Sequence, residues 1–365
     1  MKKIIVFCLI AVLTICFSCS KEPVSESGIE AMGKEIVLSA IDKLDIKPET
    51  AAACFTNAGY VSYNGESTQI LLDVIPRYSS ISIGRGNLLQ VHSSSDEPLW
   101  FAFAVKKDDN KVMMTYVSMA DNSFKFTDPV NVKVNIDQDY SVFKKALGQK
   151  SFTLVNLANG WADQAPMELM QGAMFHDHLC CGVFSGYFTV RFIQEKLPLK
   201  DGEDYTYIGA PAWCQDDYIM RQLNLTPGKH GYYTMGYSWS RPWKSDGKIY
   251  DKLGGIIIRF NSKEKTGTAS LLRFDWKEAA FTEYIGRPDF KVNWKGASWL
   301  HVLYNRFFME HLEEPEFFVS VLKEKKLTGK KDLEKLINMG TNPLKEILGP
   351  DEEWIAALMQ EGGEK

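Results

Sequence analysis

The chain has 365 residues, of which 45% are hydrophobic, and its formal net charge at pH 7 is −4. That hydrophobic content is enough for folded cores, and the length allows two or three domains. The acidic balance argues against non-specific binding to nucleic acid, so we expect no nucleic-acid partner.

The N-terminus reads as a targeting segment. A short basic stretch and an apolar run over 4–17 precede Ser18 and Cys19. This order is typical of a lipoprotein signal, with Cys19 as the lipidated residue. The apolar run is shorter than the ~20 residues that a membrane-spanning helix needs. An ordinary signal peptide or an uncleaved anchor is the alternative interpretation.

We therefore expect a cell-envelope protein, periplasmic or on the outer membrane, that a lipid attaches to the membrane outside the cytoplasm. Residues 1–18 would be the signal peptide and 19–32 a polar tether. An oxidising location permits disulfides, but few cysteines remain after the signal. They indicate a site, a pair or buried thiols, and they are Cys54, Cys180, Cys181 and Cys214.

Residues 33–150 are predicted to form a first α+β unit. Apolar periodicity predicts helices over 32–44, 67–78 and 139–147 and strands over 88–92, 99–105 and 112–119. This stretch contains no cluster of histidine and cysteine, so it reads as a scaffold or recognition domain.

A second α+β unit is predicted over 151–275, followed by a helical C-terminal region over 276–365. In the second unit we expect helices over 166–172, 181–196 and 215–223 and strands over 205–210, 231–237, 254–260 and 269–274. In the C-terminal region we expect helices over 298–312, 315–324, 331–337 and 351–359.

A weak internal repeat relates the two units. Asp73–Leu89 aligns without gaps with Asp217–Tyr233, and a Gly-basic pair falls on a Gly-basic pair. In both copies an amphipathic helix ends in that turn before a strand, which predicts a duplicated unit. Chance similarity is the rival explanation. The counterpart of Cys214 is Ile70, so the copies differ where chemistry is expected.

The most distinctive stretch runs from Phe175 to Gly182 and holds two histidines and two cysteines. In an extended segment alternate residues share a face, so His176, His178 and Cys180 would point the same way. Two imidazoles and a thiol suit a borderline-soft transition metal such as zinc. They also suit a thiolate held near two proton carriers.

Cys180 and Cys214 both stand at the start of a predicted helix, where partial positive charge lowers the pKa of a thiol. If the two helix starts meet, the metal ligands are His176, His178, Cys180 and Cys214. Asp217, one turn after Cys214, would orient a ligand histidine. The alternative is a thiol-dependent enzyme in which Cys180 is the nucleophile or redox thiol, His178 the base and Cys214 the resolving partner.

Aromatic residues are frequent in the second unit and suggest the wall of a ligand site. Trp213 and Trp239 would stack against a flat organic or tetrapyrrole-type cofactor beside the metal. Lys229 and Lys248 would offer positive charge to an anionic group. The competing interpretation is that these residues serve core and loop packing.

Taken in order, the motifs resemble the FmdE family, which takes its name from a component of formylmethanofuran dehydrogenase. Phe175–Gly182 with Gly186 is similar to the family signature Phe-His-Gly-His-x-Cys-Pro-Gly-x-x-x-Gly, and the stretch 214–217 is similar to its Cys-x-x-Asp block. The resemblance covers about 165–260. It implies an α+β fold, metal binding and a biochemical role that is poorly defined within the family.

By this resemblance the first unit is a degenerate copy, and the family site falls on His176, His178, Cys180, Cys214 and Asp217. The sequence departs from the signature at Asp177, which replaces glycine, and at Cys181, which replaces proline. No Cys-x-x-Cys zinc ribbon follows in the C-terminal part. Units of this kind with open sheet edges would allow a homodimer.

Overall fold

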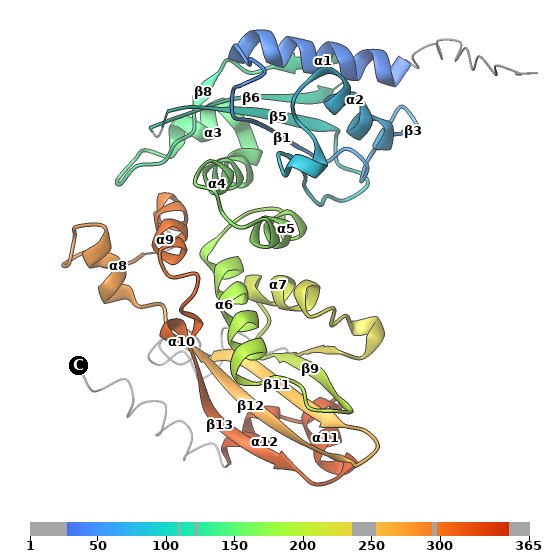
Figure 1. Ribbon diagram of the computed structural model, residues 1–365, viewed down its shortest axis with the longest axis vertical. Coiled ribbons are helices and arrows are strands. Elements are labelled where there is room, and N and C mark those ends of the chain that lie inside the picture. Colours follow the sequence, from blue (N-terminus) through green and yellow to red (C-terminus); the bar gives the residue numbers. More distant parts are fainter. Residues whose placement is uncertain (1–27, 109, 121–122, 236–252, 294–297, 350–365) are drawn as a thin grey trace, which may run out of the picture.

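The computed structural model describes residues 28–108, 110–120, 123–235, 253–293 and 298–349. Two β-sheets lie one above the other along the long axis, and helices fill the space between them (Figure 1). Further helices cover the outer face of each sheet. The mixed α+β class expected from the sequence is confirmed.

The first sheet has the strand order β4-β1-β5-β6-β7, and β8 also pairs with β6. Its strands are β1 (Ala52–Thr56), β4 (Leu88–Gln90), β5 (Trp100–Asp108), β6 (Lys111–Ala120), β7 (Ser123–Phe126) and β8 (Val130–Asn131). A small hairpin consists of β2 (Ser62–Tyr63) and β3 (Glu66–Ser67). The helices of this half are α1 (Gly28–Leu44), α2 (Leu71–Tyr78), α3 (Ser141–Leu147), α4 (Ser151–Ala162) and α5 (Met167–Phe175).

The second sheet has the strand order β10-β9-β11-β12-β13. Its strands are β9 (Glu203–Gly209), β10 (Tyr232–Thr234), β11 (Leu253–Asn261), β12 (Thr266–Phe274) and β13 (Val319–Leu327). The helices of this half are α6 (Cys181–Lys196), α7 (Cys214–Gln222), α8 (Glu278–Tyr284), α9 (Trp299–Met309), α10 (Pro315–Phe318), α11 (Lys330–Ile337) and α12 (Pro343–Leu348).

The two sheets share one topology. In each, a first strand pairs in parallel with a short edge strand and antiparallel with a long strand, from which an antiparallel meander continues. The ungapped pairing found in the sequence is reproduced in space. Under this pairing the 3₁₀ turn Ile83–Arg85 is equivalent to the 3₁₀ turn Pro227–Lys229, and β4 is equivalent to β10. The α+β fold therefore consists of two related units.

The helix pairs of the two units also correspond. Gly33 of α1 packs on Leu71 and Val74 of α2, while Gly186 of α6 packs on Gln215 and Tyr218 of α7. The repeat places Leu71 on Gln215 and Val74 on Tyr218. A glycine at the equivalent position of each unit thus permits the same close approach of two helices.

Three apolar cores hold the layers together. One lies between α1, α2 and the first sheet and includes Phe103. The largest fills the space between the two sheets and includes Phe184 of α6. The third packs α11 and α12 on the far face of the second sheet and includes Leu336. The helix pair α6 and α7 of the second unit therefore lies in the interior, whereas the corresponding pair α1 and α2 of the first unit lies on the outside.

Several elements differ from the sequence expectation, among them the following. The expected helix over 315–324 is wrong, because α10 ends at Phe318 and β13 follows. The Lys- and Glu-rich run of β13 has low strand propensity, but it pairs along β12 as an edge strand, where charged residues are tolerated. The buried strand β1 and helix α4 were not expected at all. The expected helix over 351–359 lies outside the described residues.

Candidate functional site

The segment that carries the histidines joins α5 to α6. His176 caps the end of α5, and Cys180 caps the start of α6. The residues between them turn rather than extend, and Asp177 has a φ of 72°. The extended geometry expected from the sequence is therefore wrong. Left-handed backbone is what glycine adopts most readily, which explains the glycine at this place in the signature that the segment resembles.

The first unit holds this segment in place. The backbone N–H of His92 donates to the carbonyl oxygen of Met174 over 2.9 Å. The His92 ring stacks on Phe175 with centroids 5.5 Å apart, and Tyr60 meets the His92 ring edge-on with centroids 5.1 Å apart. The end of α5 is thus attached to the unit that carries no histidine–cysteine cluster.

The first turns of α6 and α7 lie against each other. A Cβ atom on Gly182 would come within 2.6 Å of the Cys214 Cβ and 3.4 Å of the Cys180 sulfur. Only a residue without a side chain fits this contact. The two helix starts therefore converge on the same pair of thiols, and both place partial positive charge beside them.

His176, Cys180 and Cys214 form a group that can hold a metal ion, because their donor atoms all lie within 4.8 Å of one another. One imidazole nitrogen and two sulfurs suit zinc or another thiophilic transition metal. The Nε2 atom of His176 is buried and has no hydrogen-bond partner among the described residues. Burying such a nitrogen without a partner is costly, and a metal ion would satisfy it.

Asp217 lies beside the other nitrogen of the same imidazole. Its Oδ2 atom is 2.6 Å from Nδ1 of His176. A carboxylate in this position fixes the orientation of the ring and leaves Nε2 available to a metal. Burial lowers the pKa of His176, but Asp217 and Cys214 outweigh burial and raise that pKa to about 10.

The two thiols of the group are unequal. The hydrogen bond with Cys180 lowers the pKa of Cys214 to about 4, against the effect of burial, and His176 contributes in the same direction. The pKa of Cys180 is raised because it shares its proton with Cys214 and because it is buried. The shifts favour the thiolate form of Cys214 and the protonated forms of Cys180 and His176.

His178 lies beside this group and is not part of it. The centroid of its ring is 4.4 Å from that of His176, while its Nδ1 is paired with the carboxylate of Asp177. Phe152 of α4 meets the His178 ring edge-on at 5.0 Å. The structure therefore brings three of the four expected donors together and turns the fourth toward Asp177.

A second histidine–cysteine contact, which the sequence analysis missed, lies next to the first. Nδ1 of His301 on α9 is 3.3 Å from the sulfur of Cys181. Burial raises the pKa of Cys181 and lowers that of His301 to about 4, so a neutral thiol faces a neutral imidazole. Cys181 is the first residue of α6, where proline also fits well. The only signal in the sequence was a histidine within a largely apolar helix.

A buried polar network supports the two helix starts from behind. The Ser185 hydroxyl donates to the carbonyl oxygen of Gly182 over 2.8 Å, and a further contact of 3.3 Å links it to the side-chain oxygen of Gln215. The Gln215 amide donates to the Tyr207 hydroxyl over 3.2 Å. This network ties the turn that carries Cys180 to the helix that carries Cys214.

The remaining candidates are less closely tied to the group. Trp213 caps α7, and its ring meets Trp276 edge-on at 5.6 Å. Lys229 is exposed, and its ammonium group donates to the side-chain oxygen of Asn224. Trp239, Lys248 and the lipidation candidate Cys19 lie outside the described residues. Within the described ranges, no helix has both the length and the apolar character needed to cross a bilayer.

Comparison with known families gives one match. Residues 175–355 match the model described as FmdE, molybdenum formylmethanofuran dehydrogenase operon. The match supports the resemblance inferred from the motifs, and it extends past them to include α9 and His301. No curated protein matched the sequence.

Proposed function

From the FmdE match over residues 175–355, we propose that the chain binds a transition metal, with zinc as the best-fitting ion. His176, Cys180 and Cys214 would supply one nitrogen and two sulfurs, and Asp217 would orient the imidazole. A fourth position would remain for His178 or for a small molecule. In zinc proteins an open fourth position is a property of sites that bind or activate a ligand.

The observation that carries the proposal is the convergence of donors from two helix starts. His176 and Cys180 flank one turn, Cys214 opens another helix, and all three donor atoms lie within 4.8 Å. Apolar packing does not account for a buried imidazole nitrogen that lacks a hydrogen-bond partner among the described residues. A metal ion accounts for both features.

The metal content of the purified chain tests this proposal. We expect about one zinc ion per chain after exposure to zinc and removal of excess, measured by plasma mass spectrometry. The Cys180→Ser and Cys214→Ser variants should lose it. Cys54→Ser is the matched control, because Cys54 is a fully buried thiol in β1 of the first unit. Full zinc content in both site variants, with circular dichroism unchanged, would contradict the proposal.

One observation favours a second candidate, a thiol-dependent enzyme. With its pKa lowered to about 4, Cys214 is a thiolate at neutral pH and lies beside the imidazolium of His176. This geometry favours Cys214 as the attacking thiol and Cys180 as its resolving partner. Brief alkylation with iodoacetamide at pH 6 distinguishes the candidates. Selective modification of Cys214 in a chain that takes up no metal supports the enzyme, whereas protection by zinc supports the metal site.

A lipid anchor at Cys19 and a location outside the cytoplasm are the second part of the proposal. The lipoprotein-type order of the N-terminal sequence supports them. Incorporation of labelled palmitate into the full chain, abolished in a Cys19→Ala variant, is the expected result. A flat cofactor beside the metal has weaker support, which comes from the edge-on pair of Trp213 and Trp276.

A further inference from the structure

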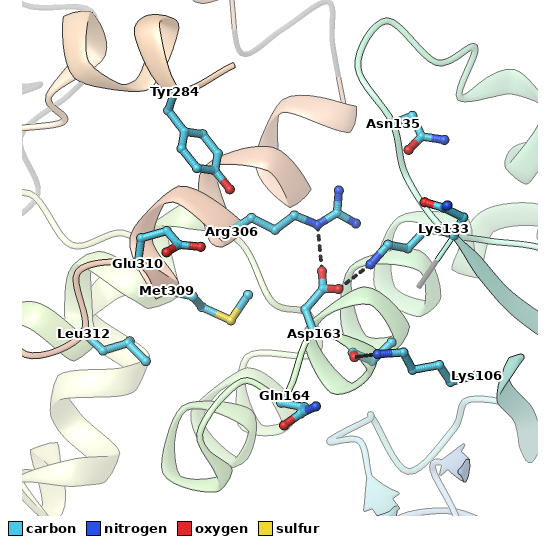
Figure 2. A pocket seen from close by; sticks show the side chains of 12 residues that line it. Lys106, Lys133, Asn135, Asp163, Gln164, Tyr284, Arg306, Met309, Glu310 and Leu312 are labelled. Carbon is cyan, nitrogen blue, oxygen red and sulfur yellow. Dashed lines mark hydrogen bonds and ion pairs between the residues drawn. The ribbon is translucent and has the colours of Figure 1, made fainter. Parts of the chain in front are cut away.

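A cavity of about 600 Å³ lies where the first unit meets the C-terminal helices. Its walls come from the end of β5, the segment after β8, the end of α4, and the region of α8 and α9 (Figure 2). We propose that this cavity binds a small organic anion, namely a carboxylate that also carries hydroxyl groups. The proposal is independent of the metal site, because none of the three donors lines the cavity.

The floor of the cavity contains two cations that share one carboxylate. Asp163 accepts from Lys133 and, over 2.7 Å, from Nε of Arg306. The three side chains are only 11%, 15% and 19% exposed for Lys133, Asp163 and Arg306 respectively. In so sheltered a place, a second positive charge without its own counter-ion is costly, and a bound anion would relieve that cost.

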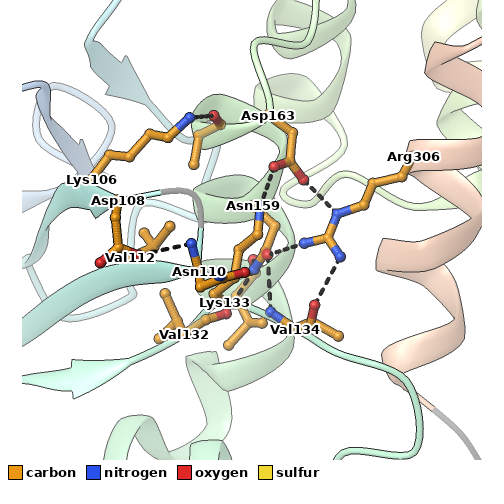
Figure 3. A network of polar contacts seen from close by, with 12 residues as sticks. Lys106, Asp108, Asn110, Val112, Val132, Lys133, Val134, Asn159, Asp163 and Arg306 are labelled. Carbon is orange, nitrogen blue, oxygen red and sulfur yellow. Dashed lines mark hydrogen bonds and ion pairs between the residues drawn. The ribbon is translucent and has the colours of Figure 1, made fainter.

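Arg306 is held rigidly in this position. Its Nη1 donates to the carbonyl oxygen of Val134 over 2.8 Å and its Nη2 to the side-chain oxygen of Asn159 over 2.9 Å (Figure 3). Asn159 is itself fixed by bonds to the backbone of Val132 and Val155. The guanidinium group is therefore held at the cavity whether or not a ligand is bound, as a preorganised binding group is.

The charged side chains of the described lining suit a singly charged ligand. Lys106, whose ammonium group donates to Ala162 at the end of α4, is a third cation. Glu310 adds one further negative charge at the exposed rim. The two cations of the triad share one carboxylate and leave one positive charge for a bound anion, which suits a monoanion better than a polyphosphate.

The rest of the lining favours hydroxyl groups on the ligand. The lining includes the Tyr284 residue, which carries a hydroxyl group, and three residues with side-chain amides, namely Asn110, Asn135 and Gln164. Met309 provides a small apolar wall beside them. A cavity of about 600 Å³ also exceeds what a bare carboxylate would fill, and its size is within the range of small-molecule sites.

Calorimetry with matched probes tests the proposal on the purified full chain. Glucuronate and gluconate are the probes, and glucose is the control because it has similar hydroxyl groups without the charge. We expect both carboxylates to bind and glucose not to bind. Lys106→Gln should weaken glucuronate binding about tenfold, and Glu310→Gln should tighten it about threefold, because the first variant removes a positive charge from the lining and the second removes a negative one. Both residues lie outside the buried triad, so both variants should fold.

Four results would overturn the proposal. The first is the absence of binding by both carboxylates at millimolar concentrations. The second is binding of glucose equal to that of glucuronate, which would remove the role of charge. The third is an unchanged affinity in both variants, which would place the probe elsewhere. Inorganic phosphate that binds as tightly as glucuronate would contradict the role of the hydroxyl groups.

Discussion

The two units of this chain share a fold and differ in what they place inside it. Gln215, Ser185 and Tyr207 form a buried polar network behind the donor group in the second unit. The corresponding residues of the first unit, given by the glycine contacts and the strand pairing, are Leu71, Met32 and Cys54.

Buried polar groups are costly unless they are hydrogen-bonded, so a fold that works with apolar residues at these places does not need them. We therefore infer that the network serves the proposed metal site of the second unit rather than the fold. The first unit thus lacks both the metal-binding donors and the polar residues that support them in the second unit.

The largest expected effect concerns the two equivalent glycines. In Gly186→Ala the new Cβ would lie 2.6 Å from the backbone oxygen of Gln215, which cannot move without separating α6 from α7. We expect a loss of about 3 kcal/mol in the free energy of unfolding, together with loss of metal. In Gly33→Ala the nearest atom, at 2.5 Å, is the flexible end of Leu71, and the gain in helix propensity offsets the contact. Urea denaturation compares the two, and equal losses would contradict this difference.

The second prediction concerns proton release. Cys180, with its raised pKa, and His176, with a pKa of about 10, must both lose a proton to bind a metal at neutral pH. Zinc affinity should therefore rise about a hundredfold per pH unit between pH 6 and 8. Titration in two buffers with different ionisation enthalpies counts the protons. Cys54→Ser should leave the count unchanged, since the pKa of Cys54 is raised by burial alone in the unit without donors.

The third prediction uses a pair of aspartates that the repeat aligns. Asp217→Asn keeps the shape of the side chain but removes the charge beside His176, and zinc affinity should fall about tenfold. Asp73→Asn is the matched control, because Asp73 is exposed on α2 of the first unit. Competition with a chromogenic chelator measures both variants. A similar loss of zinc affinity in both variants would show that the Asp217 carboxylate acts through the net charge of the protein rather than through the His176 imidazole.

The smallest effects come from exchanging residues between the units. In Gln215→Leu the Ser185 and Tyr207 hydroxyls keep their backbone partners, so folding should persist while zinc affinity falls about threefold. In Leu71→Gln a buried amide enters an apolar core, which should cost about 2 kcal/mol of stability with unchanged zinc affinity. A loss of stability in Gln215→Leu together with a loss of zinc affinity in Leu71→Gln would refute the functional role of the network.

The sequence allowed more of the fold than of the site to be predicted. Periodicity placed α6 at its observed bounds, and the ungapped repeat placed both 3₁₀ turns and both short edge strands. Local patterns carry such information because they reflect which face of an element is buried. The run of β13 was misread because its sequence is charged and its strand conformation depends on pairing with β12.

At the site, local sequence placed His176 and Cys180 near each other, and the helix-start argument added Cys214. The extended geometry that was expected for the segment from His176 to Cys180 was wrong, since Asp177 turns the chain. The contact of His301 with Cys181 joins positions 120 residues apart, and no local pattern specifies a contact of that range. The cavity beside Arg306 could not be predicted for the same reason, because its walls come from four stretches that are distant in the sequence.

The bond from His92 to Met174 has a consequence for how the molecule is made. A chain leaves the ribosome N-terminus first, so the first unit can be complete before the histidine–cysteine turn emerges. That turn then forms against a surface that already exists. Separating the halves would leave α5 without the ring of His92 against Phe175, so the half that has no donors still belongs to the assembly of the site.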